Sequence, residues 1–84
     1  MVEWPAWWHW ELELSQHLLK RMIDRGFSEV DLREMLEDAT GFQPNHEPGR
    51  FTISAPLDGH PFELVVEPLM MEEVLLVVTA YPIA

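Results

Sequence analysis

The chain has 84 residues, which suits one small domain that buries roughly 60% of the surface exposed by its unfolded chain. A hydrophobic content of 48% favours a packed core over a disordered chain. The absence of cysteine excludes disulfide bonds and thiolate metal sites. The formal net charge is −10, from 15 acidic residues against 5 Lys and Arg, and this acidity disfavours binding to nucleic acids, which usually requires a basic surface.

We expect neither a membrane span nor a secretion signal in this sequence. Its longest apolar run, Val74 to Ala80, is far shorter than the roughly 20 residues of a transmembrane helix. The first four residues lack the basic region and small-residue cleavage site of a signal peptide. We therefore expect a cytoplasmic protein with no membrane partner. We also expect a single domain over residues 1–84, in which a tryptophan-rich arm (1–9) precedes an α+β domain (10–83).

Four tryptophans lie within seven residues, from Trp4 to Trp10, ahead of any regular pattern. Large aromatic side chains dominate burial in small proteins, so one interpretation is an arm that plugs the core. In a second interpretation Trp7 and Trp8 form an interface with a partner subunit, for instance in a homodimer. Stacking of nucleic-acid bases on these rings is a third, disfavoured by the glutamates nearby.

The first regular elements are a strand and a helix. Residues 10–14 alternate between apolar and acidic side chains, which predicts a short strand with its glutamates outward, as is typical of a sheet edge. Ser15 is a suitable cap for a helix over residues 16–25, which Gly26 ends in the left-handed conformation. The buried stripe of this helix is expected to contain Leu18, Leu19, Met22 and Ile23.

A second helix follows a sharp turn. Ser28 and Asp31 have the spacing of a capping box, which predicts a helix over about residues 29–39. Its buried side is expected to contain Val30, Met35, Leu36 and Ala39.

The second half of the chain predicts strands. Residues 43–49 are a turn-rich link, and strands are expected at 51–55 and 62–67 with a hairpin turn at Asp58-Gly59. Residues 74–81 are apolar on both faces, which favours a strand in the middle of a sheet. The fold class is therefore α+β, in the order strand, helix, helix and three strands. We expect two helices packed on one face of a four-stranded, mainly antiparallel sheet.

Histidine and arginine side chains share one face of the first predicted helix. His17, Arg21 and Arg25 are spaced by four residues, and Lys20 adds a further cation for binding RNA or phosphate. A neutral histidine can accept the proton of an attacking 2′-hydroxyl, while arginines stabilise the charge on the phosphate. This arrangement suits phosphodiester cleavage. An ordinary solvated helix face has the same spacing, so both interpretations stay open.

Hydroxyl groups and a further arginine come from the predicted strands. Thr79 and Tyr81 lie on one face of the last strand, where a phenol can orient a phosphate or act as an acid. A purely structural role in the sheet explains both residues equally well. Arg50 either adds a phosphate contact or pairs with a surface acid. The histidines show no metal-ligand spacing and no cofactor motif is present, so neither a metal nor a cofactor is expected.

Several short motifs follow one another in a specific order: His17, Arg21-Met22, Arg25-Gly26, Ser28, Gly49-Arg50, Val66-Glu67-Pro68 and Val78-Thr79-Ala80-Tyr81-Pro82. In this order, from about Trp10 to Ile83, the chain resembles family 4258 of domains of unknown function, small relatives of the RelE and BrnT toxin ribonucleases. The resemblance implies a RelE-like fold, in a superfamily that includes metal-independent endoribonucleases.

The chain departs from this family resemblance in its charge. RelE-type toxins are generally basic, whereas this chain is strongly acidic. The expected function is therefore that of a RelE-like, non-catalytic protein-interaction module, whose partner is a second copy or another protein. The alternative is a metal-independent endoribonuclease toxin of a toxin–antitoxin system, with an antitoxin as partner and RNA as substrate.

Overall fold

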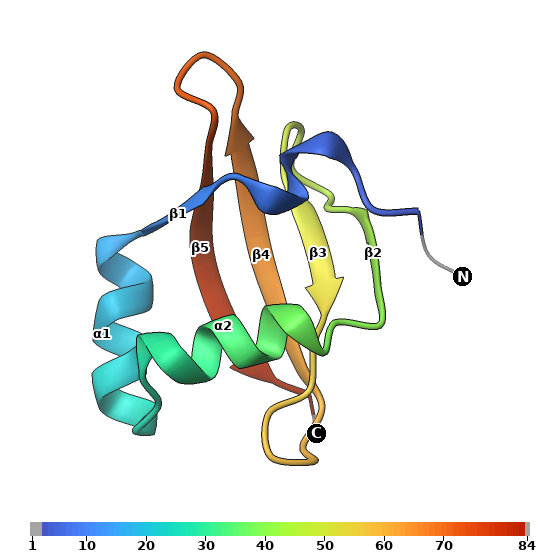
Figure 1. The fold of residues 1–84 in the computed structure, drawn as a ribbon. Coiled ribbons are helices and arrows are strands. Elements are labelled where there is room, and N and C mark those ends of the chain that lie inside the picture. The colour runs from blue at the N-terminus through green and yellow to red at the C-terminus, as the bar shows by residue number, and fades with distance from the viewer. Residues whose placement is uncertain (1–2, 84) are drawn as a thin grey trace.

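Residues 3–83 are described by a computed structural model, in which eight elements follow one another along the chain (Figure 1). They are a 3₁₀ helix η1 (Ala6–His9), β1 (Glu11–Leu14), α1 (Gln16–Arg25), α2 (Glu29–Glu37), β2 (Gly41–Pro44), β3 (Phe51–Ser54), β4 (Phe62–Leu69) and β5 (Val74–Pro82). The α+β class expected from the sequence is confirmed.

The strands within residues 3–83 form one five-stranded mixed sheet in the order β1-β5-β4-β3-β2. β1 runs parallel to β5, with Glu11 opposite Val74, and the other three neighbouring pairs are antiparallel. β5 lies between β1 and β4, as its two-sided apolarity predicts. β1, with its outward glutamates, lies at an edge, also as predicted. The prediction of four strands was wrong, because β2 is a fifth.

β2 was missed because its sequence has almost no strand signal. It is four residues long, begins with Gly41 and ends with Pro44, so no alternation can be recognised, and the expected turn-rich link covers half of it. Pro44 has no N–H to donate, which a strand tolerates at a sheet edge. Beyond the strand, the backbone N–H of Asn45 donates to the carbonyl of Arg50 at 2.9 Å and closes the turn into β3.

The β3–β4 connection has the expected hairpin at its tip. Asp58 and Gly59 both have positive φ, 50° and 78°, as a type I′ turn requires. Leu57 and His60 exchange two backbone hydrogen bonds of 2.9 Å on either side of this turn. The Asp-Gly pair therefore specifies the turn as the sequence predicts.

Ser15 fixes the start of α1 to the middle of β5. Its hydroxyl accepts the N–H of Leu18 at 3.0 Å, as an N-cap should, and donates to the carbonyl of Val78 at 2.6 Å. α1 then runs beside the second half of β5, beyond the end of β1 (Figure 1). Gly26 ends the helix in the left-handed conformation, with φ of 73°.

The position of α1 at the side of β5 leaves it a narrow contact with the core. Leu18 and Met22 are buried, but Leu19 and Ile23 are 45% and 82% exposed. The predicted apolar stripe was therefore wrong for Leu19 and Ile23. Leu19 and Ile23 are each rotated by about 100° around the helix from their buried neighbours Leu18 and Met22, and their side of the helix faces away from the core.

α2 crosses the sheet in front of the strands (Figure 1). The predicted capping box is present, since Ser28 accepts the N–H of Asp31 and the Asp31 carboxylate accepts that of Ser28. Leu32 and Met35 are fully buried, whereas Val30 is 66% exposed. The prediction for Val30 was wrong because this residue lies about 200° around the helix from Leu32.

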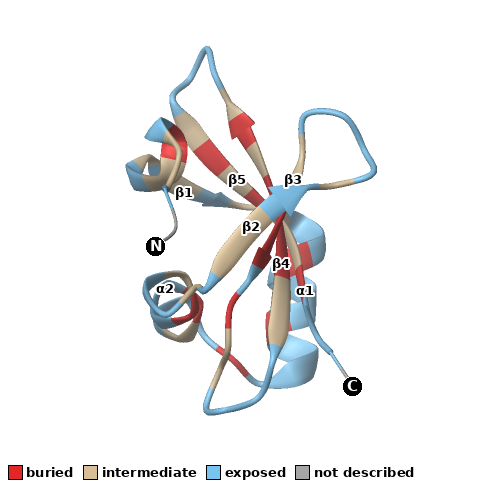
Figure 2. Cartoon of the chain, turned by 90° about the vertical axis from the view of Figure 1, so that its right-hand side faces the viewer, coloured by how far each residue is buried: buried red, intermediate tan, exposed pale blue. Residues whose placement is uncertain are grey.

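One hydrophobic core joins the sheet, both helices and η1. Figure 2 shows its buried residues on the inner parts of β4 and β5 and on the helix sides that face the sheet. The core contains Trp7, Leu18, Met22, Phe27, Leu32, Met35, Ile53, Ala55, Leu64, Val66, Leu75, Val77 and Ala80. No helix in the part of the chain described is long and apolar enough to cross a membrane.

Candidate functional site

The surface of α1 carries two different stripes. His17, Arg21 and Arg25, the residues predicted for catalysis, are all exposed along one flank. Leu19 and Ile23 form an exposed apolar pair about 200° around the helix from Arg21. Lys20 lies on the outward side between the two stripes. Sequence reasoning placed the cations correctly on an exposed face but missed that an apolar pair is exposed as well.

The cations of α1 differ from the other two arginines in their contacts. Arg33 pairs with Glu29, and Arg50 pairs with Glu47 and Glu67. Within residues 3–83, Lys20, Arg21 and Arg25 form no ion pair with an acidic side chain. Among the described residues, the Lys and Arg side chains without an ion pair therefore all lie on one helix of an acidic protein.

Tyr81, predicted as a phosphate-orienting or acidic group, is held by a carboxylate. Its hydroxyl donates to Glu63 Oε1 at 2.8 Å across β5 and β4. This hydrogen bond raises the pKa of Tyr81 above its ordinary value of 10.0, and partial burial and the negative charge of Glu63 act in the same direction. Thr79 lies two residues away, half-buried opposite Val65. Among the described residues, no hydrogen bond joins either side chain to His17, Arg21 or Arg25.

Arg50, predicted for RNA or phosphate, is engaged by two glutamates. Its Nε donates to Glu67 Oε1 at 3.0 Å, and a guanidinium nitrogen lies 3.3 Å from the carboxylate of Glu47. The arginine side chain is 32% exposed. Its charge is therefore already compensated, and a phosphate would have to compete with both carboxylates.

The two tryptophans predicted as an interface have different environments. Trp7 is only 6% exposed, and the centroid of its ring lies 5.0 Å from the ring centroid of Phe51. It is therefore a core residue within this chain, and an interface role for it conflicts with that burial. Trp8 is half-buried and stacks on Trp4 with ring centroids 4.1 Å apart and planes inclined by 23°. The arm thus plugs the core through Trp7 and keeps part of Trp8 accessible.

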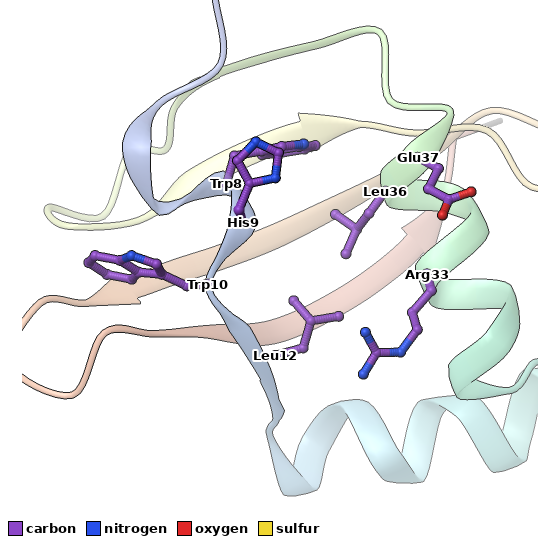
Figure 3. Close-up of a pocket in the computed structure, with 7 residues that line it drawn as sticks. All are labelled: Trp8, His9, Trp10, Leu12, Arg33, Leu36 and Glu37. Carbon is purple, nitrogen blue, oxygen red and sulfur yellow. The ribbon is translucent and has the colours of Figure 1, made fainter.

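An open cleft of about 340 Å³ separates the η1–β1 segment from α2 (Figure 3). Leu12 and Leu36 approach each other from β1 and α2, and Trp8 stands on the arm side. Polar groups come from both sides. The lining residues are Trp8, His9, Trp10, Leu12, Arg33, Leu36 and Glu37.

The sequence alone does not predict the cleft, because the cleft depends on how η1 and α2 are placed relative to each other. The local signals were nevertheless present. Arg33 and Glu37 are four residues apart, so they share one face of α2, and Leu36 lies beside that face. In Figure 3 the guanidinium of Arg33 projects from α2 toward Leu12.

Among residues 3–83, no three histidine, aspartate or glutamate side chains lie together in a group that could hold a metal ion.

Comparison of the chain with protein-family models, with curated proteins and with solved structures gives no significant match. The resemblance to family 4258 therefore rests on the motifs quoted above.

Proposed function

We propose that this chain is a non-catalytic protein-interaction module and that it contacts its partner through the exposed outer side of α1. We call this surface, made by Leu19, Lys20 and Ile23, the α1 docking face. The observation that carries the proposal is the exposure of Leu19 and Ile23, one helical turn apart and beside Lys20, which forms no ion pair within residues 3–83.

The apolar pair supplies the affinity in this proposal. Single exposed apolar residues are common, but two adjacent ones on a helix are the kind of anchor that a partner helix or groove covers. Full burial of one large aliphatic side chain contributes about 1.5–3 kcal/mol. Ile23, at 82% exposure, would gain most of that amount, and Leu19, at 45%, a smaller part.

The charge of the helix determines the kind of partner. Lys20 lies on the docking face, and Arg21 and Arg25 add to the positive potential of the same helix. The rest of the chain is strongly acidic and would repel an acidic partner from other directions. Charge complementarity therefore favours an acidic partner helix. The apolar pair favours leucine-like side chains spaced by four residues on that helix.

The endoribonuclease alternative has one feature in its favour, the free cations beside His17 on α1. Two other features count against it. Arg50 is occupied by Glu47 and Glu67, and Tyr81 is occupied by Glu63, so neither group is available to a phosphate without losing its present partner. The interaction module requires no such exchange.

The test is a titration of isotope-labelled protein, followed by amide chemical shifts, with two helical peptides. Both peptides carry leucines spaced by four residues, and the flanking positions are glutamates in one and lysines in the other. We expect the acidic peptide to shift α1 resonances in a saturable way and the basic peptide to bind more weakly. The double variant Leu19→Ser, Ile23→Ser should lose this binding.

Met71→Ser is the matched control, because Met71 is 94% exposed but lies in the β4–β5 turn. It should bind the acidic peptide as the wild type does. Equal loss of binding in the control and in the double variant would contradict the proposal, as would peptide binding that leaves α1 unshifted.

A further inference from the structure

The cleft between the arm and α2 has a charge pattern that the interaction module does not use. Arg33 and Glu37 both line it, and their spacing puts their Cβ atoms about 5–6 Å apart on one helix face. They form no ion pair with each other within residues 3–83. One positive and one negative side chain therefore come from the same wall, with the guanidinium pointing toward Leu12 and the carboxylate pointing away from it (Figure 3).

Arg33 forms only a weak ion pair in the present structure. Its ion pair with Glu29 has a long N–O distance of 3.8 Å, and the two side chains are 57% and 55% exposed. Exposed pairs of this kind are weak, so a carboxylate that enters the cleft can replace Glu29. The planar guanidinium can bind a carboxylate through two parallel hydrogen bonds.

Apart from His9 on the arm side, the rest of the cleft lining is apolar. Leu12 and Leu36 are half-buried and face the same space as the ring of Trp8 (Figure 3). These groups suit an aliphatic or aromatic side chain. The volume of about 340 Å³ is at the lower end of the range of small-molecule sites, which are roughly 300–1,000 Å³.

From these features we infer that the cleft binds a free α-amino acid with a large apolar side chain, its carboxylate on Arg33, its ammonium on Glu37 and its side chain against Leu12, Leu36 and Trp8. Net charge supports a zwitterion over a singly charged ligand. An anionic ligand is repelled by the net negative charge of the protein, and a cationic ligand is repelled by Arg33 in the cleft. A zwitterion has no net charge and satisfies both groups. This site is separate from the α1 docking face.

The experiment compares three probes of one shape in titrations followed by chemical shifts. L-Leucine carries both charges, isocaproate carries only the carboxylate, and isoamylamine carries only the ammonium. We expect leucine to shift the indole N–H signal of Trp8 and the methyl signals of Leu12 and Leu36, and each single-charge probe to bind at least about tenfold more weakly. Retention of α-helix, measured by circular dichroism, confirms that each variant is folded.

Variants assign each charge to its partner. Arg33→Gln should abolish the advantage of leucine over isoamylamine, and Glu37→Gln should abolish its advantage over isocaproate. Glu34→Gln, an exposed position of α2 outside the cleft, should leave all three affinities unchanged. The inference is overturned if leucine causes no shifts at millimolar concentration, if the three probes bind equally well, or if both cleft variants bind leucine as tightly as the wild type does.

Discussion

Tyr81 and Glu63 face each other on neighbouring strands, and the phenol donates a 2.8 Å hydrogen bond to the carboxylate. This pair ties the end of β5 to the start of β4. It also occupies the hydroxyl that a phosphodiester site would need. The chain contains a single tyrosine, so the protonation state of this one group can be followed without overlap from others.

The pair predicts an alkaline pH dependence. Glu63 favours the neutral phenol, first through the hydrogen bond, so the pKa of Tyr81 lies above 10.0 in the folded protein. The folded state then holds this proton more tightly than the unfolded state. The stability that follows is complete below about pH 10 and is lost as the pH rises through the folded pKa. Tyrosinate absorbance measures that pKa.

Glu63→Ala should return the pKa of Tyr81 toward its ordinary value. Glu72→Ala, at an exposed position of the β4–β5 turn, serves as the control and should leave it unchanged. Identical titrations of the wild type and Glu63→Ala would show that the hydrogen bond is not formed in solution.

The tryptophan arm predicts unequal losses of stability. Trp7→Ala should lower the free energy of unfolding by about 3–5 kcal/mol, since it removes a buried aromatic side chain from the core. Trp8→Ala should cost less, on the order of 1–2 kcal/mol, because Trp8 is half-buried and loses mainly its stacking on Trp4. Urea unfolding measures both. Equal losses would contradict the placement of Trp7 in the core.

The two serine caps provide a second stability comparison. Ser28→Ala removes one exposed cap and should cost about 0.5–2 kcal/mol. Ser15→Ala removes a cap and also the hydrogen bond to the Val78 carbonyl, so its cost should be larger by about 1 kcal/mol. The difference is measured by thermal or urea unfolding. A larger loss for Ser28→Ala would show that the contact between α1 and β5 contributes little.

RNA cleavage separates the proposed function from its alternative. We expect purified protein to leave RNA intact, alone and on ribosomes. The alternative predicts metal-independent cleavage that a chelator does not change and that His17→Ala lowers by about a hundred- to ten-thousand-fold without changing the melting temperature. That second pattern would refute a non-catalytic role.

Most of the secondary structure could be predicted because its signals are local. The Ser15 and Ser28 caps, the Gly26 stop and the Asp58-Gly59 turn each depend on a few neighbouring residues, and all four are found as expected. β2 could not be predicted in this way. Its four residues become a strand only because β3 offers them a partner, and that pairing is a tertiary interaction.

The candidate sites depended even more on tertiary placement. The exposure of Leu19 and Ile23 results from α1 lying at the side of β5, which hydrophobic periodicity alone does not indicate. The cleft requires η1 to stand across from α2. The pairing of Arg50 with Glu67 and of Tyr81 with Glu63 depends on strand register, which the sequence pattern left open.

The central claim, that α1 binds an acidic partner, is tested most directly by two variants that each lower the net charge by one unit. Lys20→Gln removes the cation of the docking face, and Gln43→Glu adds an acid on the exposed edge strand β2. Affinity for the acidic helical peptide is measured for both. Lys20→Gln should weaken binding by about three- to tenfold, and Gln43→Glu should change it little. Equal weakening by both variants, or no effect of Lys20→Gln, would contradict the account.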